Sequence, residues 1–197
     1  TAIGDQSLQN NTGSENSALG KGSLNANTSG QYNTALGRSA LNQNTTASNN
    51  TAVGYQASYS GTTADNTVAI GRQALYSATT GGGNVAVGST SMYATTGTDN
   101  AAFGTSTLRF NTSGSSNVAV GLQALYSNTT ASNNTAVGYK AGYSNTTGTI
   151  NSAFGLQALY NNTTANNNSA FGALSLYSNT TGSENTAVGR EALQANT

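Results

Sequence analysis

The chain of 197 residues lacks cysteine, histidine, tryptophan and proline, and it carries few charged side chains. The absence of cysteine and histidine excludes disulfides, thiolate or imidazole metal sites, and the commonest general base of enzymes. Charged residues are 6% of the chain, against about 25% in typical domains. Six basic and six acidic side chains cancel, so no basic face is available for phosphate groups. We therefore expect no enzyme activity, cofactor, metal or nucleic-acid partner.

Long hydrophobic runs are also missing from the sequence. No segment approaches the roughly 18 apolar residues that a membrane helix requires, and no signal-peptide pattern opens the chain. We expect no membrane insertion by this segment. Large aliphatic residues are scarce, which by itself would favour disorder, but they fall at fixed intervals, and disorder does not explain such spacing.

One glycine recurs at every sixteenth or seventeenth position along the whole chain, which makes twelve copies of a unit. A position that is glycine in every copy needs either a positive φ or space that a Cβ would fill. We therefore expect a structural corner here and treat residues 1–197 as a single array of repeats. These corner glycines are Gly4, Gly20, Gly37, Gly54, Gly71, Gly88, Gly104, Gly121, Gly138, Gly155, Gly172 and Gly189.

Other positions are equally regular when counted from the corner glycine. The residue two before it is always alanine, the residue one before it is always large and apolar, and the residue four before it is asparagine except at Thr67. The residue four after it is usually leucine, and the residue eight after it is always threonine. A unit of this length is too short for a helix pair or a propeller blade, but it suits one coil of a parallel β-solenoid with two short strands and two turns.

Alternation along a strand assigns each column a direction. We expect the large apolar column and the leucine column to face the interior, and the alanine column to face outward. Stacked asparagines can form an amide ladder from coil to coil, and stacked threonines can do the same with hydroxyl groups. Because the core is thin and an outward alanine strip permits close approach, we predict a parallel homotrimeric rod, about 55 to 60 Å long at roughly 4.8 Å per coil.

The five-residue segments "NTAVG", "NSAFG" and "NVAVG" resemble the head repeats of trimeric autotransporter adhesins and the related repeats of bacteriophage tail fibres and tail spikes. The resemblance covers the whole chain, although the unit is longer here than the usual repeat of that family. It implies a left-handed parallel β-roll in an extracellular fibre, on a cell surface or a virion, that attaches to a host or cell surface. The chain begins and stops inside a unit, so we expect a segment of a longer fibrous protein.

Tyrosine recurs five residues after the corner glycine in seven copies. Such a stripe could contact a surface glycan or a cell-surface receptor by stacking on sugar rings, or it could simply cover a corner or an interface between chains. The stripe consists of Tyr59, Tyr76, Tyr93, Tyr126, Tyr143, Tyr160 and Tyr177.

Three acidic residues, Glu15, Asp65 and Asp99, lie eleven residues after a corner glycine. We expect them to share one turn position at separations of about 14 and 10 Å, too far apart for a shared metal ion, and to be solvated. The function that we predict is a shaft or head segment of an attachment fibre. The alternatives are an ice-binding solenoid, suggested by the threonine column, and an extracellular-matrix filament.

Overall fold

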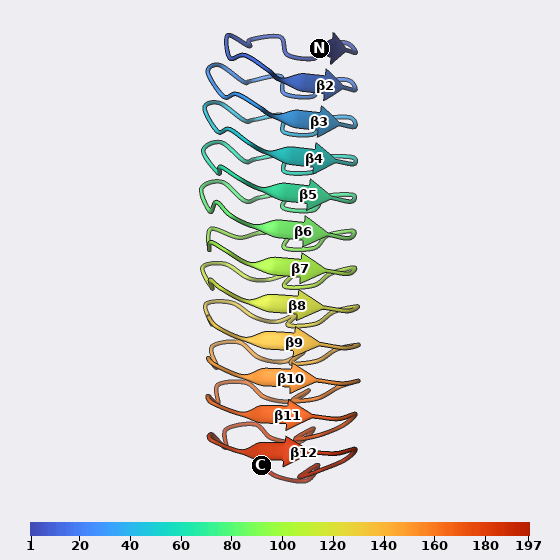
Figure 1. The fold of residues 1–197 in the computed structure, drawn as a ribbon, viewed down its shortest axis with the longest axis vertical. Coiled ribbons are helices and arrows are strands. Elements are labelled where there is room, and N and C mark those ends of the chain that lie inside the picture. The colour runs from blue at the N-terminus through green and yellow to red at the C-terminus, as the bar shows by residue number, and fades with distance from the viewer.

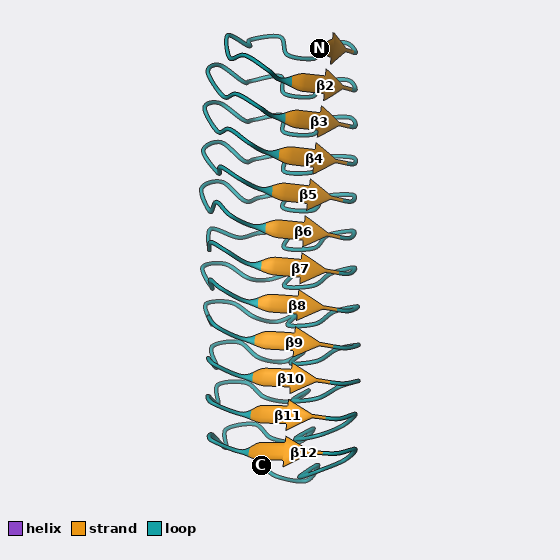
Figure 2. Ribbon diagram, viewed as in Figure 1, coloured by secondary structure: helices purple, strands orange, loops and turns teal.

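Twelve short strands form one parallel sheet in the computed structural model, which describes all residues from 1 to 197. Each strand pairs with the next one in the chain, so the coils stack in sequence order as a column (Figure 1). Figure 2 shows strands and loops only, which confirms the predicted all-β parallel solenoid. The strands are β1 (Ala2–Ile3), β2 (Ser17–Leu19), β3 (Thr34–Leu36), β4 (Thr51–Val53), β5 (Val68–Ile70), β6 (Val85–Val87), β7 (Ala101–Phe103), β8 (Val118–Val120), β9 (Thr135–Val137), β10 (Ser152–Phe154), β11 (Ser169–Phe171) and β12 (Thr186–Val188).

The pairing register keeps equivalent residues opposite one another in every coil. Ala69 pairs with Ala86 across a unit of the usual length, and Ala86 pairs with Ala102 across a unit that is one residue shorter. The missing residue of the shorter unit is therefore absorbed in a turn and does not shift the sheet. A shift by one residue would exchange the two faces of every later strand, so this tolerance of the turns preserves the solenoid.

Each coil contains one strand, and the prediction of a second strand around the leucine column was wrong. The leucines lie in a turn and have left-handed backbone dihedrals, as at Leu24 (φ 48°) and Leu125 (φ 49°). The backbone of this segment still bonds the next coil, because the Leu24 amide donates to the carbonyl of Ala40 at 3.0 Å. Of 124 backbone hydrogen bonds, 103 lie in the connecting segments and at their junctions with the strands. The hydrogen bonds of the turns stabilise the left-handed backbone conformation, which by itself is unfavourable by roughly 1 to 2 kcal/mol per residue.

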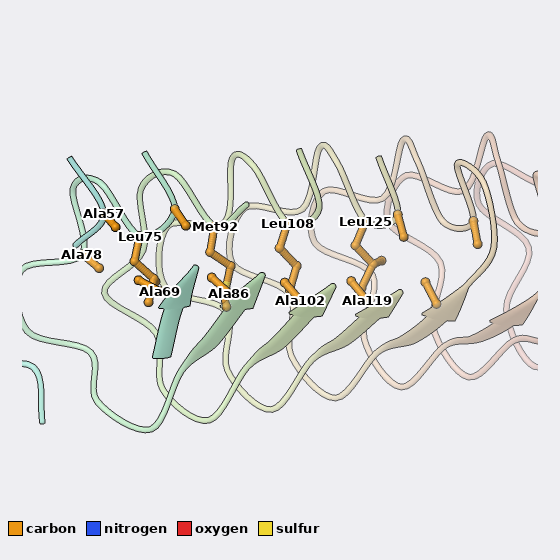
Figure 3. Packing of buried hydrophobic residues seen from close by; sticks show 14 of the residues in the cluster. Ala57, Ala69, Leu75, Ala78, Ala86, Met92, Ala102, Leu108, Ala119 and Leu125 are labelled. Carbon is orange, nitrogen blue, oxygen red and sulfur yellow. The ribbon is translucent and has the colours of Figure 1, made fainter. Parts of the chain in front are cut away.

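The strands point their alanines inward and their large apolar residues outward, which is the reverse of the predicted orientation. Ala86 and Ala119 are fully buried, whereas Phe103 and Leu36 of the large apolar column are 43% and 42% exposed. In Figure 3 four strand alanines face the leucine or methionine six residues later in the chain, as Ala102 faces Leu108. The coil is so narrow that a leucine from one wall leaves room for only a methyl group from the other.

The corner glycines satisfy both conditions that the sequence suggested. All twelve have φ between 120° and 140°, where side chains are strongly disfavoured. Eleven of them also lie against the next coil: a Cβ at Gly121 would stand 2.6 Å from the carbonyl oxygen of Gly138. A side chain in this column would therefore meet both an unfavourable φ and the backbone of the next coil.

The predicted amide ladder forms inside the coils from the asparagines four residues before the corner. The side-chain oxygen of Asn117 accepts the backbone N–H of Asn134 at 3.0 Å, and its amide nitrogen donates to Asn100 Oδ1 and the Ala131 carbonyl. A second buried amide ladder, which we did not predict, runs seven residues after the corner, where Asn128 Nδ2 donates to Asn111 Oδ1 at 2.9 Å. Both ladders satisfy buried polar groups that water cannot reach.

Three copies lack the core leucine; one has the equally buried Met92, and two have a small residue. Gly142 replaces it in one coil and leaves a small enclosed space beside Leu125 and Leu159. Ser58 replaces it in another, where Gly61 also takes the place of the second-ladder asparagine. With no amide at residue 61, Asn44 Oδ1 is buried without a hydrogen-bond partner. The coil that contains Ser58 therefore lacks both the core leucine and the second-ladder amide.

Restoring the regular residues in that coil should stabilise the chain. We expect the double variant Ser58→Leu/Gly61→Asn to raise the melting temperature, because a buried leucine contributes about 1.5 to 3 kcal/mol. The amide of residue 61 gives Asn44 Oδ1 a donor but leaves its own oxygen opposite Ala78 without one, so it adds little. Residue 58 already has φ 48°, so leucine adds no new backbone strain. The single variant Gly61→Asn should gain less, because its Cβ would lie 2.7 Å from Ser58 Oγ. A double variant that melts no higher than the parent in thermal and urea denaturation contradicts this reasoning.

Candidate functional site

The tyrosine stripe forms stacked columns of rings along one side of the rod. Each tyrosine is the residue directly after the core position of its coil, and its ring is half-buried. Neighbouring rings are nearly parallel, at 5.1 Å and 2° for Tyr126 and Tyr143 and at 5.1 Å and 4° for Tyr143 and Tyr160. We call the two runs the first tyrosine ladder, which consists of Tyr59, Tyr76 and Tyr93, and the second tyrosine ladder, which consists of Tyr126, Tyr143, Tyr160 and Tyr177.

One coil without a tyrosine separates the two ladders. Arg109 occupies the tyrosine position there, and its guanidinium carbon lies 5.4 Å from the centre of the Tyr93 ring. The adjacent Phe110 meets Tyr126 edge to face, with centroids 5.0 Å apart and planes at 84°. A cation over an aromatic face is favourable, so the arginine closes the end of the first ladder without extending the stack.

Stacking limits what the tyrosines can offer to a ligand. Sugar recognition by an aromatic residue uses the face of the ring, and the faces inside each ladder are covered by neighbouring tyrosines. Only the ring edges and hydroxyl groups remain open along the side of the rod. This geometry favours the structural interpretation of the stripe, in which the rings brace one coil against the next.

A second cation on this side of the rod is Lys140, whose Nζ lies 5.2 Å from the Tyr143 ring centre and 5.3 Å from that of Tyr139. It lies at the edge of the second ladder, as Arg109 lies at the end of the first. The tyrosine ladders are thus accompanied by two of the six cationic side chains of the chain.

The ladders should make stability fall at alkaline pH. Burial raises the pKa of the Tyr76 phenol above 10.0, and the neighbouring Tyr93 and Tyr59 raise it further. The unfolded chain therefore loses this proton first, so the contribution to stability is complete below about pH 10 and is lost as the pH rises above it. We expect the melting temperature to fall as the pH rises above about 10, and to fall less for Tyr76→Phe. Parallel pH curves for the two proteins would contradict this.

A continuous apolar column runs along the outer face of the sheet, and we call it the apolar strip. It includes strongly exposed side chains such as Ile3 at 58% and Phe171 at 41%. Phe171 stacks on Phe154 of the preceding coil at 5.0 Å. The strip consists of Ile3, Leu19, Leu36, Val53, Ile70, Val87, Phe103, Val120, Val137, Phe154, Phe171 and Val188.

Further apolar side chains widen the strip on both sides. Val118, three residues before a corner glycine, is 39% exposed, and Leu122, Tyr139 and Leu156, directly after corner glycines, are 42 to 48% exposed. A contiguous apolar surface of this length is unusual for a protein that stays alone in water. The sequence prediction missed this surface because it placed the column inside. The signal was present, since this position accepts valine, isoleucine, leucine and phenylalanine, as an open surface can.

The acidic residues do not share one column as predicted. Glu15 and Asp99 occupy the same left-handed position, with φ 58° for each, but Asp65 lies one position earlier, next to the left-handed Asn66. All three lie eleven residues after a corner glycine, but Glu15 and Asp99 belong to the two shorter units. They therefore lie one residue closer to the next corner glycine than Asp65 does. Asp65 Oδ1 accepts the Ser48 amide at 2.6 Å. No group of three or more acidic residues converges on a point that could hold a metal ion.

The threonine column uses its hydroxyl groups within the rod. Nine of these side chains donate to the backbone carbonyl of the threonine in the next coil, as Thr112 Oγ1 donates to the Thr129 carbonyl at 2.9 Å. The predicted hydroxyl ladder therefore forms, through backbone acceptors. Hydroxyl hydrogens that are bonded internally are not free to order ice, so the geometry does not favour the ice-binding alternative.

The chain contains no helix that is long and apolar enough to cross a membrane. No protein-family model, no curated protein and no solved structure matches it.

Proposed function

We propose that the chain is a shaft or head segment of an extracellular attachment fibre that binds a host or cell surface, in the setting of a phage tail fibre or a bacterial surface adhesin. The observation that carries the proposal is the apolar strip. A solenoid that repeats one coil makes a rod, and a rod with one apolar side is suited to join copies of itself lengthwise. The resemblance of the five-residue segments that end at corner glycines to adhesin and tail-fibre repeats agrees with this assignment.

The same strip is the proposed contact between three parallel copies. Alanines cannot serve as this contact, because they are buried in the core. The strip presents a large apolar side chain in every coil and carries no charge. Three strips that meet on a common axis would therefore remove all of these side chains from water. Burial of apolar area contributes about 25 cal/mol per Å², so every coil adds to the free energy of association when the contact runs the length of the rod.

Sedimentation equilibrium on the whole chain tests the assembly. We expect a mass of three times 19.7 kDa for the parent and a monomer mass for Val120→Lys, because a lysine in the middle of the strip would bury unpaired charge. Ile150→Lys is the matched control, since Ile150 is 57% exposed in a turn away from the strip; it should remain trimeric. A monomeric parent, or a trimer that tolerates Val120→Lys, overturns the proposed contact.

Attachment is tested by binding of the labelled chain to bacterial cells, to cells stripped of surface polysaccharide, and to a glycan array. We expect saturable binding to at least one surface. The variants Tyr126→Ala and Tyr143→Ala show whether the second tyrosine ladder takes part: unchanged binding with a lower melting temperature assigns the ladder to stability alone. A trimer that binds none of these surfaces contradicts the attachment proposal while leaving the rod intact.

A further inference from the structure

The two tyrosine ladders place phenol rings of successive coils face to face at nearly constant separation. Centroid distances within the ladders are 5.0 to 5.3 Å, and the planes differ by 2° to 16°. The rings are half-buried, so their edges are open to small molecules. We propose that the ladders are oxidative modification sites, at which a one-electron oxidant such as a haem peroxidase with hydrogen peroxide joins neighbouring coils through dityrosine.

The chemistry uses the two phenols and the peroxide alone. Each phenol loses one electron and one proton to give a phenoxyl radical, whose spin density is high at the carbon ortho to the oxygen. Two radicals on adjacent rings combine through these carbons, and the two ortho hydrogens move to the oxygens to restore both aromatic rings. Hydrogen peroxide takes the two electrons and two protons and becomes two molecules of water.

The ladder geometry supplies what this coupling needs. Coupling of two radicals is slow when they must meet by diffusion, and holding the partners side by side raises their effective concentration by orders of magnitude. In each ladder the partner is always the equivalent ring of the adjacent coil, one repeat unit away along the chain. The remaining tyrosines, Tyr32, Tyr55 and Tyr139, stack on no aromatic ring. Tyr32 is the only tyrosine between Lys21 and Arg38, so its tryptic peptide serves as an internal reference.

The break at Arg109 gives the proposal a specific pattern. Tyr93 and Tyr126 belong to different ladders, with Arg109 and Phe110 between them. Coupling should therefore join Tyr59 with Tyr76, Tyr76 with Tyr93, and each neighbouring pair of the second ladder. It should not join Tyr93 with Tyr126. Each bond would lock two coils together, as a covalent cross-link that restricts the unfolded chain.

Tryptic cleavage separates the partners of two pairs, Tyr59 with Tyr76 and Tyr126 with Tyr143, because the chain is cut only after its six lysines and arginines and the other pairs lie within one peptide. Tyr59 lies in peptide 39–72 and Tyr76 in 73–109, while Tyr126 lies in 110–140 and Tyr143 in 141–190. After treatment with peroxidase and hydrogen peroxide, we expect dityrosine fluorescence in protein of unchanged chain mass on a denaturing gel. We also expect the joined peptides 39–72/73–109 and 110–140/141–190, each lighter by two hydrogen atoms, and no joined 73–109/110–140.

Two controls isolate the role of the fold. Tyr143→Phe keeps the ring and removes the phenol, so the joined 110–140/141–190 peptide should fall below detection while 39–72/73–109 persists. The chain oxidised in guanidinium chloride should lose the pattern and yield 73–109/110–140 as well. Coupling only between separate chains, equal patterns in the folded and unfolded protein, or no dityrosine in the folded protein would each overturn the proposal. None of these outcomes depends on attachment or on the trimer.

Discussion

Gly121→Val is expected to destabilise the rod more than any other single substitution considered for this chain. A valine at φ 122° occupies a region that β-branched residues avoid, and its Cβ would lie 2.6 Å from the carbonyl oxygen of Gly138. Because the neighbour is backbone, no side-chain rotation relieves the contact, and the two coils have to separate. We expect a loss of more than about 4 kcal/mol in thermal and urea unfolding followed by circular dichroism.

Gly189→Val is the matched control for this prediction. Gly189 has nearly the same dihedral, φ 120°, but nothing lies within 4 Å of its Cβ position. This variant therefore suffers the backbone strain without the collision, and we expect a loss of about 1 to 3 kcal/mol. Equal losses in the two variants would show that the strain alone requires glycine and that the coils have room for a side chain.

The second large effect is expected for Asn117→Asp at neutral pH. The amide nitrogen of Asn117 donates to Asn100 Oδ1 at 3.0 Å and to the Ala131 carbonyl at 2.9 Å. A carboxylate oxygen in its place would face two acceptors inside a site that is 0% exposed. An uncompensated buried charge costs roughly 3 to 5 kcal/mol, and we expect a loss of that size in unfolding experiments at pH 7.

The pH dependence of this variant separates charge from lost hydrogen bonds. The site disfavours the charged form, so the pKa of the introduced carboxyl is raised above its ordinary value of about 3.9 in the folded chain. The penalty is therefore smallest below about pH 4 and grows as the pH rises through the raised pKa. Asn117→Ala loses the same hydrogen bonds without a charge and should show a constant deficit. If the two variants depend on pH alike, the buried-charge argument fails.

Much of the fold follows from the spacing of the corner glycines. Their recurrence predicted the solenoid, the number of coils and the parallel stacking, because a unit of this length has few other ways to bury its apolar residues. It also predicted one amide ladder. These features depend on position along the chain, which periodicity reports directly.

The direction of the strand faces could not be read from hydrophobicity. We assumed that the larger apolar residue is the buried one, as transfer energies suggest. The coil is too narrow for this, because Leu108 and its equivalents already fill it, and only an alanine such as Ala102 fits opposite. The better indicator was variation between copies: the alanine never changes, and the outward residue changes freely in size.

The conformation of the leucine segment was equally hard to foresee. Left-handed dihedrals at leucine and glutamine are rare in ordinary proteins, and the sequence around a residue such as Leu24 does not predict its φ of 48°. The conformation is imposed by hydrogen bonds between coils, which exist only after the coils stack. For the tyrosine stripe, the sequence predicted the alignment of the rings, but the covered ring faces became evident only from their parallel packing.

The irregular residues of the core and ladders have a consequence for how the chain winds. Almost any coil here could pair with almost any other, because each strand offers the same backbone pattern, and a chain that skipped one coil would still form a parallel sheet. Ser58, Gly61, Arg109 and Gly142 make particular coils distinguishable from their neighbours. A skip that placed Tyr126 on Tyr93 would expel the whole coil that carries Arg109. These residues therefore distinguish particular coils within an otherwise uniform repeat, so that skipping one of those coils would place unlike residues in the same column.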